Sequence, residues 1–185
     1  PENRRSWTPD PFPAPDMDPV CIVGAGPAGL AAGAALKARG IPFRIVDAGS
    51  GPGGLWDIGR ADTPLYRSAH FISSRSLSGF PGFPMPDDYP DYPGHERVLA
   101  YLRSYAEHHR LHEDAVFDTR VVDAVREDPG GAAGPWRVTV EATADPGGGP
   151  PSDSTAAPGD GSRQEWRASA LIGASNFFEL AVAAA

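Results

Sequence analysis

The chain of 185 residues has the length of one ordinary domain, at roughly 100–200 residues per domain. Sixteen basic residues against 24 acidic ones give a net charge of −8, and without a basic patch we expect no nucleic-acid partner. A single cysteine, Cys21, excludes an internal disulfide and is typical of a reducing compartment, so we expect a cytoplasmic protein. No apolar run reaches the ~20 residues of a membrane span.

Glycine and proline together supply nearly a quarter of the chain, with 22 and 21 residues. That share excludes a coiled coil or a continuous helical bundle. The two residue types gather in tracts, so we expect a disordered proline-rich leader over 1–19 and a flexible loop over 145–161. Between them, residues 20–176 have the pattern of one folded domain, and residues 177–185 form an atypical alanine-rich tail.

The domain begins with the pattern of a β-α-β unit. Val20–Val23 is a short apolar run, typical of a buried parallel strand. Pro27–Arg39 is rich in alanine and is predicted to be a helix, because proline stands at its start and Gly40 follows its end. Phe43–Asp47 is predicted to be the second strand.

Further along, the patterns predict one more helix and several strands. His95–Arg110 is amphipathic, with one apolar face made of Val98, Leu99, Leu102, Tyr105 and Ala106. Before this helix, Ala48–Pro64 is expected to be a glycine-rich loop and Leu65–Met85 mostly loop. The remaining predicted strands are Ala115–Phe117, the antiparallel meander Val121–Glu127, Trp136–Glu141 and Gln164–Ala168, and Ser169–Ala174, which returns to the parallel sheet.

A glycine motif lies between the first strand and the first helix. The residues Gly24, Ala25, Gly26, Pro27, Ala28 and Gly29 spell GxGxxG. In a dinucleotide site the first glycine permits a tight turn, the second lets a pyrophosphate approach the backbone, and the third lets helix and strand pack closely. The helix N-terminus then offers free amides and a partial positive charge to the phosphates.

Asp47 stands at the end of the second strand, 23 residues after Gly24. This is close to the spacing of the carboxylate that binds the two hydroxyls of an adenosine ribose. An acid there suits FAD or NAD and would repel the 2′-phosphate of NADP. The sequence therefore predicts a Rossmann-like dinucleotide site that does not itself hold NADPH.

The order of GxGxxG, the acid and the stretch Gly53-Gly54-Leu55-Trp56 resembles the flavin-containing monooxygenase family and its Baeyer–Villiger relatives. The resemblance continues through Tyr66-Arg67-Ser68, through the stretch from Gly82 to Pro90, and into Val98–Ala106. It implies that Gly54, Leu55 and Trp56 wrap the FAD pyrophosphate and ribityl chain. It also implies an α/β FAD-binding domain with an inserted antiparallel meander, incomplete at its C-terminus.

The resemblance further implies the chemistry of the full-length protein. NADPH reduces bound FAD, and dioxygen then supplies an oxygen atom to a nitrogen or sulfur nucleophile or to a ketone of a small molecule. The cofactor performs the difficult step, so no catalytic residue is assigned, and the histidines at positions 108, 109 and 112 are expected to be a solvated helix end and not a metal site.

Three departures from the family pattern stand out. The family's asparagine beside the flavin falls at or beside Ile72, where Ser73 or Ser74 is the candidate replacement donor. An Ala-Thr-Gly that contacts FAD reads Ala174-Ser175-Asn176 here. The family's second glycine motif, which holds NADPH, has no counterpart, so we expect a truncated protein.

Two other functions remain open. One is a truncated, catalytically silent module that binds FAD or another dinucleotide. The other is the NAD-binding Rossmann domain of a dehydrogenase, which the Gly53–Trp56 segment and the meander disfavour.

Overall fold

A computed structural model describes residues 18–60, 63–128, 134–143 and 163–173 of the chain. The predicted leader, apart from its last two residues, the 145–161 loop, the Ala174-Ser175-Asn176 segment and the 177–185 tail lie outside these described residues. The elements in chain order are β1 (Val20–Val23), α1 (Pro27–Lys37), β2 (Phe43–Val46), η1 (Gly54–Trp56), α2 (Arg75–Ser78), α3 (His95–His108), η2 (Leu111–Asp114), β3 (Ala115–Val116), β4 (Thr119–Arg126), β5 (Trp136–Ala142), β6 (Arg163–Ala168) and β7 (Ala170–Gly173).

Four strands form a parallel sheet in the order β3-β2-β1-β7. Central strand β1 pairs with β2 on one side and β7 on the other, so that Cys21 lies opposite both Arg44 and Leu171. The predicted β-α-β unit and the predicted return of the chain to the parallel sheet are both confirmed. The Cys21 thiol is buried in this strand, which raises its pKa to about 12 and keeps it protonated and inert at neutral pH.

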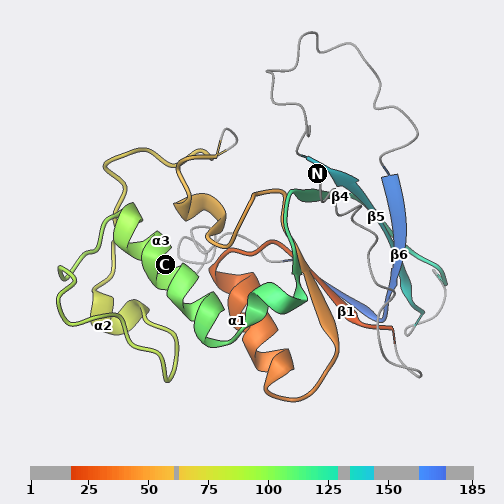
Figure 1. The fold of residues 1–185 in the computed structure, drawn as a ribbon, viewed down its shortest axis with the longest axis horizontal. Helices are drawn as coiled ribbons and strands as arrows, with labels where there is room; N and C mark the ends of the chain where they lie inside the picture. The colour runs from red at the N-terminus through yellow and green to blue at the C-terminus, as the bar shows by residue number, and fades with distance from the viewer. Residues whose placement is uncertain (1–17, 61–62, 129–133, 144–162, 174–185) are drawn as a thin grey trace, which may run out of the picture.

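A second sheet is the antiparallel meander β4-β5-β6, inserted between β3 and β7. Val138 on its middle strand is buried between Ala124 of β4 and Trp166 of β6 in the register. Figure 1 shows this sheet at the end of the molecule away from α2. The fold is therefore the predicted Rossmann-like domain with its inserted meander.

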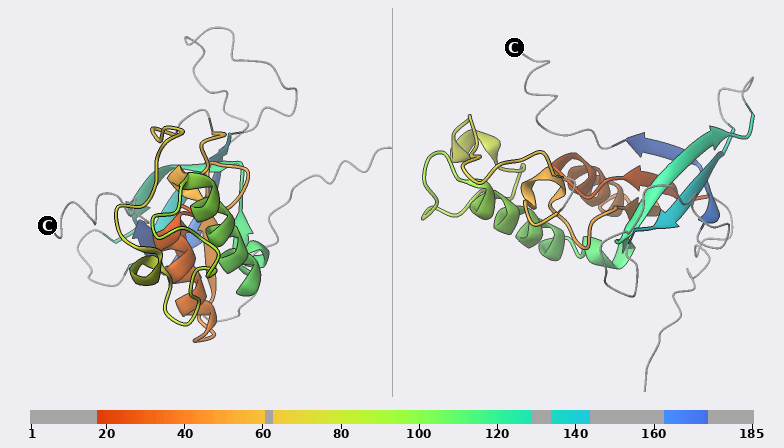
Figure 2. Two further views of the ribbon diagram at one scale, coloured as in Figure 1. Left: turned by 90° about the vertical axis from the view of Figure 1, so that its left-hand side faces the viewer. Right: turned by 90° about the horizontal axis from the view of Figure 1, so that it is seen from above.

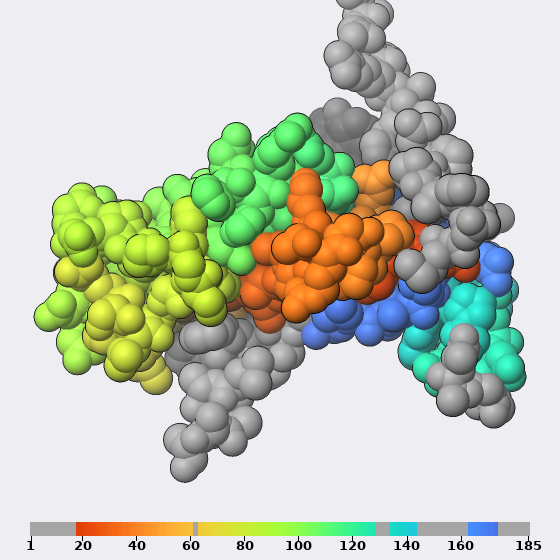
Figure 3. All heavy atoms as spheres, turned by 90° about the horizontal axis from the view of Figure 1, so that it is seen from below, coloured from red at the N-terminus to blue at the C-terminus, as the bar shows by residue number. Residues whose placement is uncertain are grey.

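Helices α1 and α3 cover the parallel sheet and form the larger of two hydrophobic cores with it. Leu30 of α1, Ile22 of β1 and Val98 of α3 are each at most 1% exposed. Figure 2 shows the two helices next to each other, with the antiparallel sheet at the end of the molecule opposite to α2 and α3. In the space-filling view the residues around α1, in red and orange, lie in the middle of one face between the 75–95 region and the two sheets (Figure 3).

Most element bounds differ from the sequence prediction by one or two residues, and short helices form where a loop was predicted. Helix α1 ends at Lys37 and not at Arg39, because the chain turns through residues 38–40 and Gly40 adopts a φ of 64°. A short helix, α2, forms at Arg75–Ser78 inside the stretch predicted as mostly loop. Its four residues are too few to give a periodic pattern, so sequence spacing has no signal for it.

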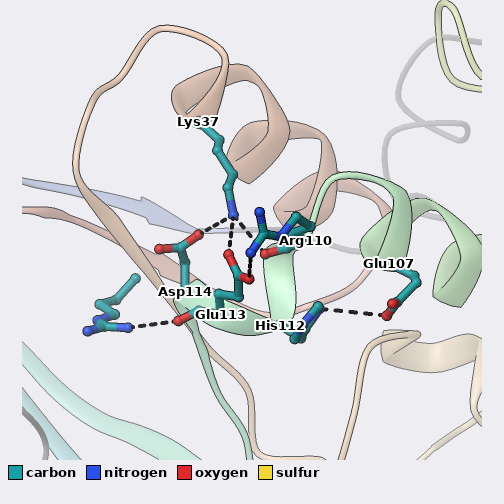
Figure 4. A network of polar contacts seen from close by, with 7 residues as sticks. Lys37, Glu107, Arg110, His112, Glu113 and Asp114 are labelled. Carbon is teal, nitrogen blue, oxygen red and sulfur yellow. Dashed lines mark hydrogen bonds and ion pairs between the residues drawn. The ribbon is translucent and has the colours of Figure 1, made fainter.

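The C-terminal end of α1 is fixed by an ionic network with η2 (Figure 4). The Lys37 ammonium donates to the Arg110 carbonyl at 2.7 Å and to Asp114 Oδ2 at 2.9 Å, and it lies 3.4 Å from Glu113 Oε2. Arg110 also pairs with Glu113, which helps to lower the pKa of that carboxyl. Lys37 is the chain's one lysine, and its contacts join the end of α1 to the segment that leads into β3.

Over the described part of the chain, no helix combines the length and the apolar character that crossing a membrane would require.

Candidate dinucleotide-binding site

The GxGxxG residues form the turn between β1 and α1, as predicted. Gly24 has a φ of 104°, a conformation that side chains rarely adopt, and its amide donates to the Val46 carbonyl at 2.8 Å. Gly26 is the N-cap of α1, in extended backbone and with no side-chain cap, and Pro27 occupies the first turn. The turn thus places a helix N-terminus directly behind two glycines.

The first turn of α1 keeps donors available for an anion. Leu30 is the first residue whose amide reaches a helical carbonyl, that of Gly26 at 3.0 Å. The Ala28 and Gly29 amides therefore have no acceptor within the helix, and no side chain caps them. A Cβ added to Gly26 would lie 3.7 Å from Gly54 Cα, an ordinary contact, so the empty fold itself leaves room at this position. A bare backbone beside free amides is the arrangement that a pyrophosphate requires.

The segment Gly53–Trp56 packs directly on this turn. The Gly53 amide donates to the Ala25 carbonyl at 3.0 Å. Gly54 has a φ of 56°, and a Cβ added to it would lie 2.8 Å from Gly26 Cα. The second glycine of the pair is thus required by a backbone contact within the protein, whatever else it does towards a ligand.

Leu55 and Trp56 continue this segment as part of η1. Trp56 is buried and meets Phe71 edge-on, with ring centroids 4.9 Å apart. The Leu55 carbonyl accepts the Thr63 hydroxyl at 2.9 Å. The Trp56 side chain therefore belongs to the hydrophobic core, and any contact of this residue with a cofactor would come from its backbone side. That both residues wrap a flavin cofactor stays a prediction.

Asp47 follows β2 and turns its carboxylate back to the glycine turn. Oδ2 accepts the Ala25 amide at 2.6 Å, and Oδ1 accepts the Gly49 amide at 2.7 Å. Arg60 completes the group, because its Nη1 lies 2.8 Å from Oδ1. The acid predicted to bind ribose is thus at the correct edge of the sheet, and it also ties the second strand to the phosphate turn.

Arg60 is the site residue that the sequence reasoning missed. Its guanidinium lies where any side chain at position 49 would have to go, which explains the glycine there. The Asp47 and Arg60 side chains are only 6% and 18% exposed, so the ion pair is largely sheltered from water. No spacing rule connects an arginine 13 positions downstream with the acid, and only the folded loop brings the two together.

Helix α3 holds the Gly53–Trp56 segment from its outer side. Arg103 donates to Asp57 Oδ2 at 2.9 Å and to the Pro52 carbonyl at 3.4 Å. The Leu99 side chain covers Gly53, leaving no space for a Cβ at that position. The amphipathic helix predicted from the sequence therefore supports one wall of the candidate site.

Ser73, a predicted replacement donor, contacts α2 and makes none of the contacts described above. It is exposed, and its hydroxyl is 2.6 Å from that of Ser78 in α2. Figures 1 and 2 place α2 at the end of the molecule away from the antiparallel sheet. The neighbouring Ile72 is 75% exposed. The role of Ser73 towards a flavin stays a prediction.

The stretches that the structure describes contain no group of three or more histidine, cysteine, aspartate or glutamate side chains able to hold a metal ion. Of the helix-end histidines, His109 packs 4.5 Å from the Tyr105 ring. Burial, together with His108 and Lys37, lowers its pKa. His112 lies 3.7 Å from Glu107. These contacts account for the histidines as part of the helix end.

The fold and the turn define an α/β dinucleotide-binding unit. A family described as flavin-binding monooxygenase-like matches residues 17–146, which is more than half of the chain, so the chain belongs to this family. Flavin-containing monooxygenase 1 of Mus musculus is 34% identical over 127 residues, covering 65% of this chain and 24% of the relative. The chain thus spans about a quarter of the length of the curated relatives it matches.

Solved structures agree with this assignment. The flavin-containing monooxygenase of Stenotrophomonas maltophilia is 28% identical, with a TM-score of 0.62 over 86% of this chain and 38% of that protein. An oxidized steroid monooxygenase bound to NADP is 27% identical, also with a TM-score of 0.62, over 85% of this chain and 25% of that protein. Both the family and the predicted fold class are confirmed.

Proposed function

We propose that this chain is the FAD-binding part of a flavin-dependent monooxygenase. The observation that carries the proposal is the space beside Gly26, at an uncapped helix N-terminus, with the Asp47 carboxylate one strand away. The pyrophosphate of FAD would lie on the Ala28 and Gly29 amides, and the adenosine ribose would reach Asp47. An acid at this position suits the unphosphorylated ribose of FAD.

Bound FAD would supply the redox chemistry, drawing electrons from NADPH and activating dioxygen in the full-length protein. The described residues contribute binding and orientation. The turn fixes the phosphates, and Gly54 closes its backbone against Gly26 so that the two loops form one wall. NADPH would enter as a co-substrate held by another part of the protein.

The substrate class proposed is a small molecule. One matching human protein carries the name dimethylaniline monooxygenase, N-oxide-forming, and one structural relative is a steroid monooxygenase. Oxygenation at nitrogen or sulfur and oxygen insertion beside a ketone both fit the family. A cytoplasmic location is proposed on the free, buried thiol of Cys21.

The test is to add FAD to the purified, FAD-free chain and to record flavin absorbance, flavin fluorescence and thermal unfolding. The proposal predicts saturable binding and a higher unfolding temperature, because a ligand that binds only the folded state stabilises it. A well-folded chain that leaves FAD free in solution would overturn the proposal. A chain that retains NAD and not FAD would favour the dehydrogenase alternative.

A second candidate function is a silent module: a chain that binds FAD and does not oxidise NADPH. The observation that favours it is the span of about a quarter of the relatives' length. NADPH consumption by the FAD-loaded chain would contradict this candidate, and its absence beside clear FAD binding would support it.

A further inference from the structure

The Asp47 carboxylate has most of its acceptor capacity in use before any ligand arrives. An ionised carboxylate offers about four acceptor positions, two on each oxygen. Ala25 uses one on Oδ2, while Gly49 and Arg60 use two on Oδ1. One position is left, on the oxygen that faces the phosphate turn. The two hydroxyls of a ribose therefore cannot both bond to this carboxylate unless one of the present donors leaves.

The present donors are firmly held. The Ala25 and Gly49 amides are backbone groups, fixed by the turn and by the loop. The Asp118 amide also donates to the Gly49 carbonyl at 2.8 Å, which anchors that loop to the start of β4. Neither amide can move away without the fold of this edge of the sheet changing.

Arg60 is held as well, by charge and by packing. Its contact with Asp47 is a charge-assisted hydrogen bond at 2.8 Å between two sheltered groups, and such bonds are about twice as strong as neutral ones. The guanidinium fills the space above Gly49 that a side chain would take. A neutral ribose hydroxyl is a weaker donor and does not replace this contact.

We infer that Arg60 is a positioning residue that limits Asp47 to a single ribose hydroxyl and fixes the carboxylate oxygen that accepts it. This inference rests on the proposed function, since it concerns the adenosine half of the same dinucleotide. It differs from the expectation that the acid takes the hydroxyl pair, which stays a prediction, and it makes Arg60 a determinant of which ribose the site accepts.

The probes are ADP, 2′-deoxy-ADP and 3′-deoxy-ADP, with dissociation constants measured by calorimetry on the full chain. For the parent chain we expect one deoxy analogue to bind about tenfold or more weakly than ADP, the effect of losing a hydrogen bond to a charged group. The other analogue should bind within about twofold of ADP. A merely structural role for Arg60 would leave this asymmetry unchanged when Arg60 is replaced.

The variant Arg60→Met keeps much of the side chain's apolar length and removes its donors, which frees a position on Oδ1. Both deoxy analogues should then bind more weakly than ADP, because both hydroxyls can reach the carboxylate. Arg75→Met is the matched control, since Arg75 pairs with Asp87 at 3.0 Å on an exposed surface. It should keep the parent's asymmetry.

Equal weakening of both analogues with the parent chain, or no weakening of either, would overturn the inference. This comparison of the two analogues needs only the parent chain, so it can be made even if Arg60→Met does not fold. Failure of ADP itself to bind would instead count against the proposed function, and the inference would fall with it.

Discussion

At the scale of single residues, the glycines of the GxGxxG turn and of the Gly53–Trp56 segment are required for different reasons. Gly54 is required by the protein's own backbone, because a Cβ there would lie 2.8 Å from Gly26 Cα. Gly26 meets no such obstacle from within the protein. The glycine at position 54 is thus explained by folding, while the glycine at position 26 is explained by a ligand that approaches the backbone.

Replacing Gly54 by alanine should therefore destabilise the fold. The residue has a φ of 56° as well as the close contact, and strain of this kind costs about 1–3 kcal/mol. Urea unfolding of Gly54→Ala against the parent measures the loss. Gly51→Ala is the control, since a Cβ at position 51 would meet nothing within 4 Å, and its stability should match the parent's. Equal stability of both variants would show that the contact with Gly26 carries no strain.

The acid at Asp47 illustrates what sequence spacing can and cannot supply. Its distance from Gly24 along the chain predicted its place at the edge of the sheet, because strand and helix lengths fix that geometry. Its bonds to Ala25 and Gly49 and its pairing with Arg60 could not be predicted, since they depend on the path of an irregular loop. Sequence patterns carry the position of such a residue, and loop geometry decides its partners.

His109 gives the fold a dependence on pH. Its pKa is lowered in the folded protein by burial and by the nearby His108 and Lys37. The unfolded chain therefore takes up a proton at a higher pH than the folded one. The contribution of neutral His109 to the stability of the fold is full above the ordinary histidine pKa of about 6.5, and it is lost as the pH falls below that value.

Thermal unfolding at about pH 7.5 and about pH 5.5 tests this dependence. The parent should lose stability between the two, and His109→Gln should lose less, because glutamine does not titrate. An unchanged difference between the two pH values would show that His109 does not contribute to it.

At the scale of elements, helix α3 organises the loop that precedes it. The Tyr101 hydroxyl accepts the Phe80 amide and donates to the Phe83 carbonyl, each at 2.6 Å. The Phe80 ring lies 4.0 Å from that of Tyr105, so aromatic packing joins the same two segments. The helix therefore fixes the 79–86 loop on one side and the Gly53–Trp56 segment on the other.

Removing that hydroxyl should loosen the loop. Tyr101→Phe leaves one backbone amide and one carbonyl without their partner in a partly buried place, which costs about 1 kcal/mol. Tyr105→Phe is the matched control, because the Tyr105 hydroxyl makes no hydrogen bond within the described residues. Chemical denaturation compares the two, and a loss for Tyr101→Phe no larger than for Tyr105→Phe would contradict the role given to the bridge.

The long elements could be predicted because each has its own pattern. The alanine-rich α1 begins with a proline. Four of the five predicted apolar residues of α3 are buried, and Leu99 packs against the same core. Tyr101 joins that face although the prediction omitted it. Short elements such as α2 depend on tertiary contacts, which a local pattern does not contain.

At the scale of the whole molecule, the two sheets have separate tasks. The parallel sheet carries the phosphate turn and Asp47 at its edge, while the meander packs against it through a smaller core that the two sheets share, with Cys21 and Val46 on the parallel side. They are joined where it matters for the site, because the Thr119 amide at the start of β4 donates to the Asp47 carbonyl at 3.0 Å. The meander thus holds the backbone of Asp47 through this hydrogen bond, and none of its residues is predicted to contact a ligand.

The most direct test of a cofactor site at this turn compares FAD binding by the parent chain and by Gly26→Ala, with thermal unfolding of both FAD-free proteins measured alongside. We expect similar unfolding temperatures, because the added methyl group makes only an ordinary contact in the FAD-free fold. We expect Gly26→Ala to bind FAD about tenfold or more weakly than the parent, because the methyl group occupies the space of the pyrophosphate. Equal FAD affinity in two equally stable proteins would contradict a cofactor site at this turn.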